Sequence, residues 1–485
     1  MDDVAGALKP GGRWRPVLGV LPGLLLVVAA VAVILAPPEH HYGLLLAAVP
    51  LLAAVVYPVS TTAVLGAVSV VLYVVLHYQR SESLDVWLIK LGLVAGFAIV
   101  GVLIAQARAR EQRLARTRDI ALALQRELLP AVVPRLPAVE VDHRYVPADS
   151  AAGVGGDWFD VIPLSGGRVA LAMGDVVGHG VHAAALMGRL RTAVQTLADL
   201  DLAPAELLSR MNDLLVRLGE EQSHREPGAT MLYLVYDPVT GCCSMASAGH
   251  TPAAFRRPDG SVEFSRMPET PPLGLPGTVF EDTDYHLAAG TVIVLYTDGL
   301  LDLRDSDPEH ALAELAAVLR TAPADSLSDL CDRITASRAT QPGDDDTALL
   351  LARTNLLDHR QVATWTLDSE PRDATRARAL IGDQLRTWGL ADLTFTTSLI
   401  ATELLSNAIR HATPPISLRL IKARTLICEV SDAAPTAPHL RRAKAMDEGG
   451  RGMYLISQLG DRWGTRWHEP GKTIWVEQHL PRGHR

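Results

Sequence analysis

The hydrophobic and polar positions divide the chain into three regions. Near the N-terminus the sequence contains four almost wholly apolar runs, and a run of roughly 20 apolar residues can cross a bilayer as a helix. From about residue 139 onward, apolar residues recur instead at the spacings of strands and amphipathic helices. We therefore expect a membrane region over residues 1–106 with four spanning helices. These spans are Val17–Ala36, Gly43–Val59, Thr61–Leu76 and Val86–Ala105.

Basic residues flank this membrane region on both sides. Lys9, Arg13 and Arg15 precede the first span, and arginines from Arg108 to Arg118 follow the last one. Because basic residues collect on the cytoplasmic side, we expect a multi-pass protein of the cell membrane with both termini in the cytoplasm. A cleaved signal peptide is the alternative for the first run, but no convincing small-residue cleavage site precedes the next span.

A helix is predicted directly behind the membrane, over Gln106–Leu129, within a linker region at 107–135. Leu114, Ala121, Leu124 and Leu128 follow an a/d-like spacing, and Pro130 and Pro134 end the pattern. Two interpretations stay open. The helix pairs with a second copy to form a homodimer, or its arginines meet anionic lipid as a solvated juxtamembrane helix.

Between residues 136 and 353 the pattern changes to short strands with interspersed helices. The predicted helices follow Gly180, up to Leu200, and cover Pro204–Gly219, His310–Arg320 and Ser326–Arg338. The predicted strands are Val139–Val141, Arg168–Met173, Ala229–Tyr236, Cys242–Ala248, Ala253–Arg257, Val279–His286, Thr291–Tyr296 and Thr347–Arg353. This order predicts an α+β domain, a β-sandwich flanked by helices.

A short linker at 354–363 leads to a third region over residues 364–485. Helices are predicted at Arg372–Gly389 and Asp392–His411, and strands at Ile416–Ile421, Leu426–Ser431 and Thr473–His479. A sheet with helices on one face, an α/β two-layer sandwich, is the natural packing of these elements. The whole chain is thus predicted to be multidomain.

Charge and cysteine content narrow the function. The 485 residues carry a formal net charge of -9, so no basic surface of the kind that nucleic acid requires is indicated. The four cysteines lack zinc-site spacing and fit reduced residues of a cytoplasmic core.

Aspartates beside glycine recur where the middle region's strands are predicted to end. The stretches are 155–160 (GGDWFD), 174–180 (GDVVGHG), 296–299 (YTDG) and 343–347 (GDDDT). Each Asp-Gly alone is a common turn. Converging carboxylates, however, repel one another unless a multivalent cation neutralises them, and an oxygen-rich site suits Mg²⁺ or Mn²⁺. Two such ions can activate a water molecule and hold a phosphoryl group.

The order of motifs resembles the SpoIIE-type branch of the PPM serine/threonine phosphatases. The motifs are LQRELLP (124–130), VGGDWFD (154–160), GDVVGHG (174–180), SAGHTPAAF (247–255), PPLGL (271–275), YTDGLLD (296–302) and DDDT (344–347). The resemblance implies two Mn²⁺ or Mg²⁺ ions and hydrolysis of phosphoserine or phosphothreonine. By motif, Asp175 would bridge the ions together with the Val176 carbonyl. The remaining ligands would be Asp157, Asp298 and Asp344, with Asp345 as the alternative to Asp344.

Two histidines and one arginine near these motifs have weaker assignments. For His179 and His250 we favour packing or support of the site over direct acid catalysis. Related enzymes outside this branch hold the substrate phosphate with an arginine just upstream of the first acidic motif. The nearest candidate, Arg144, is well removed from that motif in the sequence.

The third region resembles the GHKL ATPase fold of anti-sigma factor serine kinases. Glu403 and Asn407 share one face of a predicted helix, Ser431-Asp432 ends a strand, and residues 448–453 (EGGRGM) can offer backbone NH groups to phosphate. The motifs at 461–464 (DRWG) and 471–475 (GKTIW) complete the resemblance. It implies that Mg-ATP is bound by Asn407, Asp432, Gly450, Gly452 and Thr473, with Glu403 as the base that activates a substrate hydroxyl.

Together these regions predict a membrane-anchored bacterial regulator of a partner-switching pathway. The phosphatase would act on a phosphorylated STAS-like anti-sigma factor antagonist, and the kinase-like domain would have the opposed activity. The alternative is a C-terminal domain that only binds nucleotide or a sigma factor, without phosphotransfer. A sensor histidine kinase is disfavoured, because no helix with a phosphoacceptor histidine directly precedes the ATPase region.

Overall fold

The structure is a computed structural model of the chain. It describes residues 15–35, 45–77, 84–128, 136–147, 155–221, 228–301, 307–323, 326–338, 346–411, 414–433, 451–468 and 471–481. The chain divides into two compact units, Met1–Ile120 and Ala121–Arg485, which are described one at a time.

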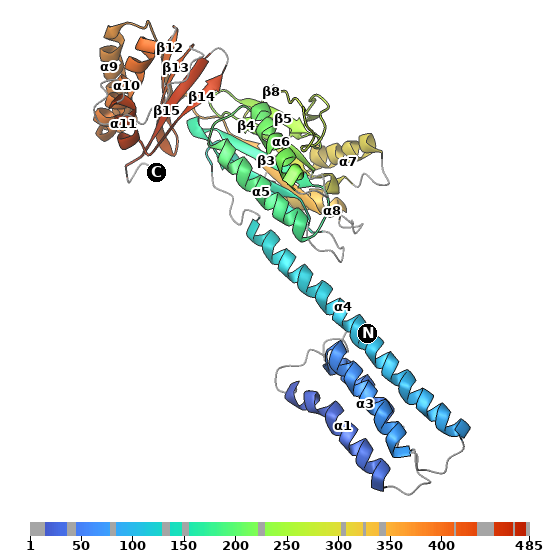
Figure 1. Cartoon of the computed structure of the whole chain (residues 1–485). Coiled ribbons are helices and arrows are strands. Elements are labelled where there is room, and N and C mark those ends of the chain that lie inside the picture. The colour runs from blue at the N-terminus through green and yellow to red at the C-terminus, as the bar shows by residue number, and fades with distance from the viewer. Residues whose placement is uncertain are drawn as a thin grey trace. The chain divides into compact units, whose positions relative to one another are not determined.

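The first unit is helical, as its apolar runs predict (Figure 1). Its helices are α1 (Arg15–Leu35), α2 (Leu45–Val56), α3 (Val59–His77) and α4 (Leu84–Leu128). By length and composition, the stretches Val59–Leu76 and Leu84–Arg113 are long and apolar enough to cross a membrane. The apolar stretches of α1 and α2, Val20–Leu35 and Leu45–Val56, are shorter. Four helices therefore occupy the predicted spans, and two of them meet the length for crossing.

Helix α4 differs from its prediction in one respect. The last predicted span and the predicted linker helix form one continuous helix of 45 residues. A helix breaks between its apolar half and its arginine-rich half only where a residue interrupts the backbone hydrogen bonds. The sequence of α4 contains no proline that would do so. The change from apolar to polar composition alone does not end a helix.

The middle region of the second unit contains two five-stranded antiparallel sheets in the described part of the chain. One has the order β1-β10-β9-β6-β7 and the other the order β2-β3-β4-β5-β8. The strands are β1 (Val139–Val146), β2 (Trp158–Pro163), β3 (Val169–Val176), β4 (Ala229–Tyr236), β5 (Cys242–Ala248), β6 (Ala254–Arg256), β7 (Val262–Phe264), β8 (Thr283–His286), β9 (Val292–Tyr296) and β10 (Thr347–Thr354).

The two sheets face each other across a buried core. Phe159 and Leu171 from one sheet and Phe255 and Ile293 from the other belong to this core. Helices cover the outer faces, so the region has four layers. These helices are α5 (Val181–Ala198), α6 (Pro204–Glu221), α7 (Pro308–Thr321) and α8 (Leu327–Arg338).

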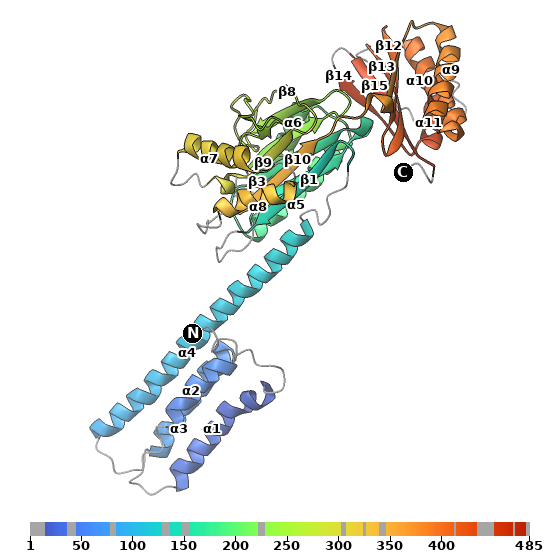
Figure 2. The same cartoon turned by 180° about the vertical axis from the view of Figure 1, so that it is seen from behind.

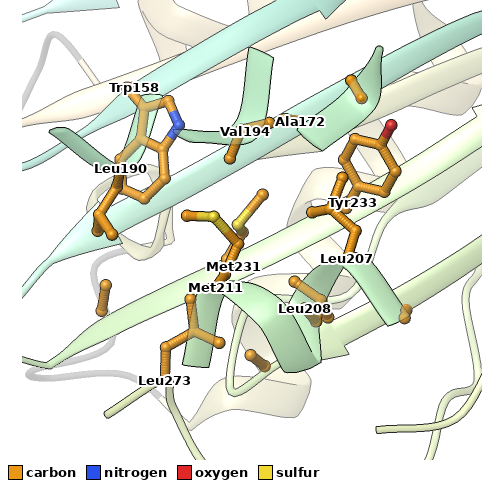
Figure 3. Packing of buried hydrophobic residues seen from close by; sticks show 14 of the residues in the cluster. Trp158, Ala172, Leu190, Val194, Leu207, Leu208, Met211, Met231, Tyr233 and Leu273 are labelled. Atoms are coloured by element: carbon orange, nitrogen blue, oxygen red, sulfur yellow. The ribbon is translucent and has the colours of Figure 1, made fainter. Parts of the chain in front are cut away.

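Helices α5 and α6 pack on the sheet that contains β3. Leu190 and Met211 from the helices lie with Trp158 and Tyr233 from the strands in one buried cluster (Figure 3). On the other sheet, α7 and α8 contribute Leu315 and Leu330 to a cluster with Val294 and Leu349, and Figure 2 shows α8 beside β1 and β10. The predicted α+β sandwich flanked by helices is confirmed.

The C-terminal region has a single five-stranded sheet of order β11-β12-β13-β15-β14. Its strands are β11 (Val362–Leu367), β12 (Ile416–Lys422), β13 (Thr425–Asp432), β14 (Arg462–His468) and β15 (Gly471–His479). Its helices are α9 (Pro371–Thr387), α10 (Thr394–His411) and α11 (Arg451–Leu459), which bury Ile381, Leu404 and Ile456 against the sheet. The predicted α/β sandwich is confirmed.

Four strands have no counterpart in the sequence-based prediction. They are β2, β7, β11 and β14, and β8 is shorter than its predicted range. β11 begins at Val362, within the segment predicted as a linker. In β11 and β14 few positions are both apolar and buried, because these strands form the edges of their sheet and part of their surface stays accessible. A period-two pattern of apolar residues is weak in such strands.

Candidate functional site

The first two acidic motifs meet because β2 and β3 are antiparallel. Trp158 at the start of β2 pairs with Gly174 near the end of β3. Asp157, one residue before β2, therefore lies beside Asp175. The prediction that each motif ends a strand is wrong for the first and the last, since GGDWFD runs into the start of β2 and GDDDT into the start of β10. Antiparallel pairing still brings the start of one strand next to the end of its neighbour.

Glycines give the two carboxylates room to approach. A Cβ atom at Gly156 would overlap the carbonyl oxygen of Val176, and one at Gly174 would overlap the Trp158 ring. The Val176 amide donates a hydrogen bond of 3.3 Å to the Gly156 carbonyl. Backbone oxygens and side-chain carboxylates are thus gathered within a few residues, which is the donor set that Mg²⁺ and Mn²⁺ prefer.

The electrostatics of Asp157 indicate that a cation belongs at this place. Asp157 is buried, and burial together with the neighbouring Asp175 carboxylate raises its pKa well above the usual range. The Thr297 hydroxyl opposes this shift by donating a hydrogen bond of 2.7 Å to Asp157 Oδ2. Two adjacent carboxylates without a countercharge repel each other, and a divalent cation removes this cost. The residues present therefore fit a metal site.

The structure brings together only part of the predicted ligand set. Asp298 begins a short 3₁₀ helix (Asp298–Leu300) after β9 and is exposed, while Asp344 and Asp345 lie outside the described residues. Among the residues that the structure describes, no group of three or more His, Cys, Asp or Glu side chains is close enough to hold a metal ion. Sequence reasoning assigned no role to Asp346, which is buried and adds to the raised pKa of Asp157.

A buried ion pair fixes helix α5, which follows the second acidic motif. Arg191 Nε donates to Asp160 Oδ2 over 2.8 Å, and Gln195 donates to Asp160 Oδ1 over 3.0 Å. Asp160 belongs to the GGDWFD motif, but its contacts are with α5. Burial raises the pKa of Asp160 even though Arg191 and Gln195 lower it.

The histidines and the arginine singled out in the sequence have different surroundings. His250 is half-buried, and its Nδ1 is 2.8 Å from the hydroxyl of Thr230, the β4 partner of Asp175. His179 is exposed, which argues against a packing role, and support of the site stays a prediction. Arg144 bonds to Asp332 over 2.7 Å and to Ser328, both at α8. It is therefore held in a structural contact.

In the C-terminal region, several predicted nucleotide-binding residues come from adjacent elements. Glu403 and Asn407 are partly buried one turn apart on α10, and the helix α11 begins at Arg451, so Gly452 lies in its first turn. Gly450 lies outside the described residues. Thr473 Oγ1 is 2.7 Å from Ser431 Oγ across the β13–β15 pair.

The structure adds a residue that sequence reasoning left without a role. Lys472 is the cross-strand partner of Asp432, and its ammonium group donates a hydrogen bond of 3.0 Å to Asp432 Oδ1. Both side chains are almost completely buried. In the sequence, only the position of Lys472 inside the GKTIW motif pointed to this ion pair. That position was not enough to predict it, because a lysine in a strand is ordinarily solvated.

Comparison with known proteins identifies both regions. Residues 165–355 match the family model of stage II sporulation protein E (SpoIIE). Residues 367–477 match the histidine kinase-like ATPase domain. The chain carries a SpoIIE-type phosphatase domain followed by a histidine kinase-like ATPase domain.

Two curated relatives match the phosphatase domain. Phosphoserine phosphatase RsbU of Bacillus subtilis is 26% identical over 198 residues, which cover 41% of this chain and 57% of RsbU. Phosphoserine phosphatase RsbP of the same organism is 24% identical over 204 residues, 41% of this chain and 47% of RsbP. The chain thus spans about half the length of the curated relatives that it matches.

Two solved structures are also similar to parts of this chain. The RsbU and RsbW domains of Rv1364c from Mycobacterium tuberculosis are 26% identical, with 73% of this chain and 96% of that chain covered and a TM-score of 0.43. The magnesium complex of RsbX is 15% identical, covers 46% of this chain and 99% of that chain, and has a TM-score of 0.37.

Proposed function

We propose that the phosphatase domain hydrolyses phosphoserine or phosphothreonine on a STAS-like anti-sigma factor antagonist in a partner-switching pathway. The observation that carries the proposal is the approach of the buried Asp157 to the half-buried Asp175 at the meeting point of β2 and β3. The match to SpoIIE and to two phosphoserine phosphatases supports the reaction class.

The site would hold two Mn²⁺ or Mg²⁺ ions. Asp175 and the Val176 carbonyl would lie between the ions, and Asp157, Asp298 and Asp344, or Asp345 in place of Asp344, would complete the protein ligands. When bound, such ions lower the pKa of a water molecule and neutralise charge on the phosphoryl group. The chain itself supplies the fixed negative charge. Thr297 orients Asp157, while the exposed position of Asp298 gives a protein substrate access to this edge of the domain.

For the C-terminal domain we propose Mg-ATP binding and phosphorylation of the same antagonist, an activity opposed to that of the phosphatase. Asn407 would hold Mg²⁺, Asp432 and Thr473 would contact the adenine end, and Gly450 and Gly452 the phosphates. Glu403 would act as the base. The second candidate is a domain that binds nucleotide or a sigma factor without phosphotransfer. The buried Lys472–Asp432 ion pair favours it, because this pair competes with adenine for the Asp432 carboxylate.

We further propose that α1 to α4 anchor both domains at the cytoplasmic face of the cell membrane. Two helices with the length and composition of spans support anchoring. The arginines in the second half of α4 support the cytoplasmic orientation, and homodimerisation through that half is part of the proposal.

Phosphate release from a phosphorylated STAS-domain antagonist tests the proposal, with the full chain in detergent and Mn²⁺ present. Asp175→Asn should lower the rate at least about 100-fold, the upper end for residues that only support a metal site. Asp213→Asn, on the exposed face of α6, is the matched control and should release phosphate like the parent chain.

The same proteins test the C-terminal domain once ATP is added to unphosphorylated antagonist. If the domain is a kinase, phosphorylated antagonist accumulates most in Asp175→Asn, because its removal is blocked. ATP binding without any transfer would support the second candidate. An Asp175→Asn protein as active as the parent chain in phosphate release would contradict the metal mechanism.

A further inference from the structure

Asp346 is a buried carboxylate that the proposed ligand set does not use. It is the third aspartate of the DDDT run and directly precedes β10, with 4% of its surface exposed. The hydroxyl of Tyr145 on β1 donates a hydrogen bond of 2.6 Å to Asp346 Oδ2. The two residues are 201 positions apart in the chain, and the antiparallel pairing of β1 with β10 brings them together.

Asp346 also touches the loops that carry two of the proposed metal ligands. A Cβ atom at Gly155 would overlap the Asp346 carboxylate, so the carboxylate lies directly on this glycine, two residues before Asp157. A Cβ atom at Gly299 would overlap the Asp346 carbonyl oxygen, so the backbone of Asp346 lies against the residue that follows Asp298. One residue thus contacts both loops.

The Tyr145 phenol can serve only as a donor to this carboxylate at neutral pH. Burial, Asp157 and Asp346 together raise the pKa of Tyr145 far above its usual range, so the hydroxyl keeps its proton. The hydrogen bond that Tyr145 donates therefore fixes the orientation of the Asp346 carboxylate against Gly155.

We propose that Tyr145 and Asp346 are positioning residues of the metal site, in which the phenol-bound Asp346 fixes the loops of Asp157 and Asp298. The proposal rests on the proposed function for the identity of the site. Asp346 is not assigned as a ligand, since the described carboxylates form no metal-binding group of three. It acts through the residues that it contacts.

Two measurements on the full chain in detergent test this role. The first is Mn²⁺ affinity by calorimetry or by the paramagnetic resonance signal of free Mn²⁺, for Tyr145→Phe, Asp346→Asn and the double variant. Loss of a residue that orients ligands raises the dissociation constant about 10- to 100-fold, and we expect about tenfold for each single variant. The double variant should be no weaker than Asp346→Asn, because Tyr145 acts through Asp346.

The second measurement is amide hydrogen exchange in metal-free protein. Tyr145→Phe should accelerate exchange at residues 155–159 and 298–300. Tyr236→Phe is the matched control, because its hydroxyl donates over 3.2 Å to the Asn355 carbonyl in another part of the fold. It should leave both the exchange of these loops and the Mn²⁺ affinity unchanged.

Several results would overturn the proposal. They are parent-like Mn²⁺ affinity in both single variants, additive losses in the double variant, unchanged loop exchange in Tyr145→Phe, and complete loss of Mn²⁺ binding in Asp346→Asn, which would make Asp346 a ligand. A parent chain that binds no Mn²⁺ would contradict the proposed function instead. The exchange measurement would then still decide whether the pair positions the loops.

Discussion

The absence of a side chain at Gly156 allows the close approach of two backbone segments at this site. The carbonyl oxygen of Val176 occupies the space that a Cβ atom at Gly156 would need. The Val176 amide also donates a hydrogen bond to the Gly156 carbonyl. The sequence showed a glycine beside an acidic residue, a pattern equally typical of a turn. The close approach that excludes a side chain is visible only when β2 and β3 are paired.

Gly156→Ala is therefore expected to damage the site itself. The added methyl group meets backbone atoms that cannot rotate away, so Asp157 and Val176 must separate, and Mn²⁺ affinity should fall at least about tenfold. Calorimetric titration measures this. Gly382→Ala on α9 meets only a methyl group at 3.6 Å and serves as the control, with unchanged Mn²⁺ binding. Equal affinities for the two variants would rule out the close approach.

His250 predicts a pH dependence of stability. Burial lowers the pKa of His250 from 6.5 to about 4. The unfolded chain therefore takes up a proton at this residue below about pH 6.5, whereas the folded chain stays neutral down to about pH 4. Stability is lost as the pH falls through this window, by up to roughly 3 kcal/mol.

The test is the thermal unfolding midpoint at about pH 8 and about pH 5, with His250→Gln as the comparison. The unfolding midpoint of the parent chain should fall further on acidification than that of His250→Gln, because glutamine does not titrate. His310→Gln, at an exposed position of α7, should retain the parent's pH dependence. The same pH dependence in all three proteins would show that His250 does not carry the effect.

At the scale of the elements, α5 is held by a contact with the GGDWFD motif that the predicted metal-binding role of this motif does not reveal. Asp160 in β2 is 2.8 Å from Arg191 in α5, and both are largely removed from solvent. The amphipathic pattern of α5 was sufficient to predict the helix almost to its ends. The residue of β2 that holds α5 could not be predicted. Asp160 and Arg191 are distant in sequence, and a single Asp or Arg does not indicate which residue it will pair with.

Removal of either partner should destabilise the domain to a different degree. Arg191→Met leaves a buried carboxylate without its partner and should cost about 3 kcal/mol, in the range for broken buried pairs. Asp160→Asn leaves an amide that still accepts hydrogen bonds and should cost about 1 kcal/mol. Urea unfolding of both variants and of the double variant measures the coupling. Equal losses for the two single variants would contradict the argument.

At the scale of the whole molecule, the proposed membrane anchoring by α1 to α4 predicts how the chain behaves on fractionation. The chain should sediment with membranes and resist extraction by alkaline carbonate, because insertion of two or more apolar helices is effectively irreversible. Membrane fractionation of the full chain checks this, with a fragment of residues 136–485 as the comparison. That fragment should remain in the supernatant. Release of the full chain by carbonate would contradict membrane insertion.

The order of the domains, by contrast, could be read from the sequence. Long apolar runs, a helical linker, alternating strand patterns and two sets of glycine and acid motifs follow one another without overlap. The matches to SpoIIE and to the histidine kinase-like ATPase domain bear out both resemblances. The continuous helix α4 could not be foreseen, because a change of composition does not reveal whether the backbone continues.

The sequence by itself determined most of the helices, the fold class and the residue types proposed for the site, because apolar periodicity and glycine placement act locally along the chain. The tertiary structure decided which side chains meet. Asp157 joins Asp175 because β2 and β3 are antiparallel, Tyr145 reaches Asp346 because β1 pairs with β10, and Lys472 faces Asp432 because β13 pairs with β15. The pairing of strands fixes these contacts across long sequence separations, and the apolar pattern of one strand does not show which strand is its partner.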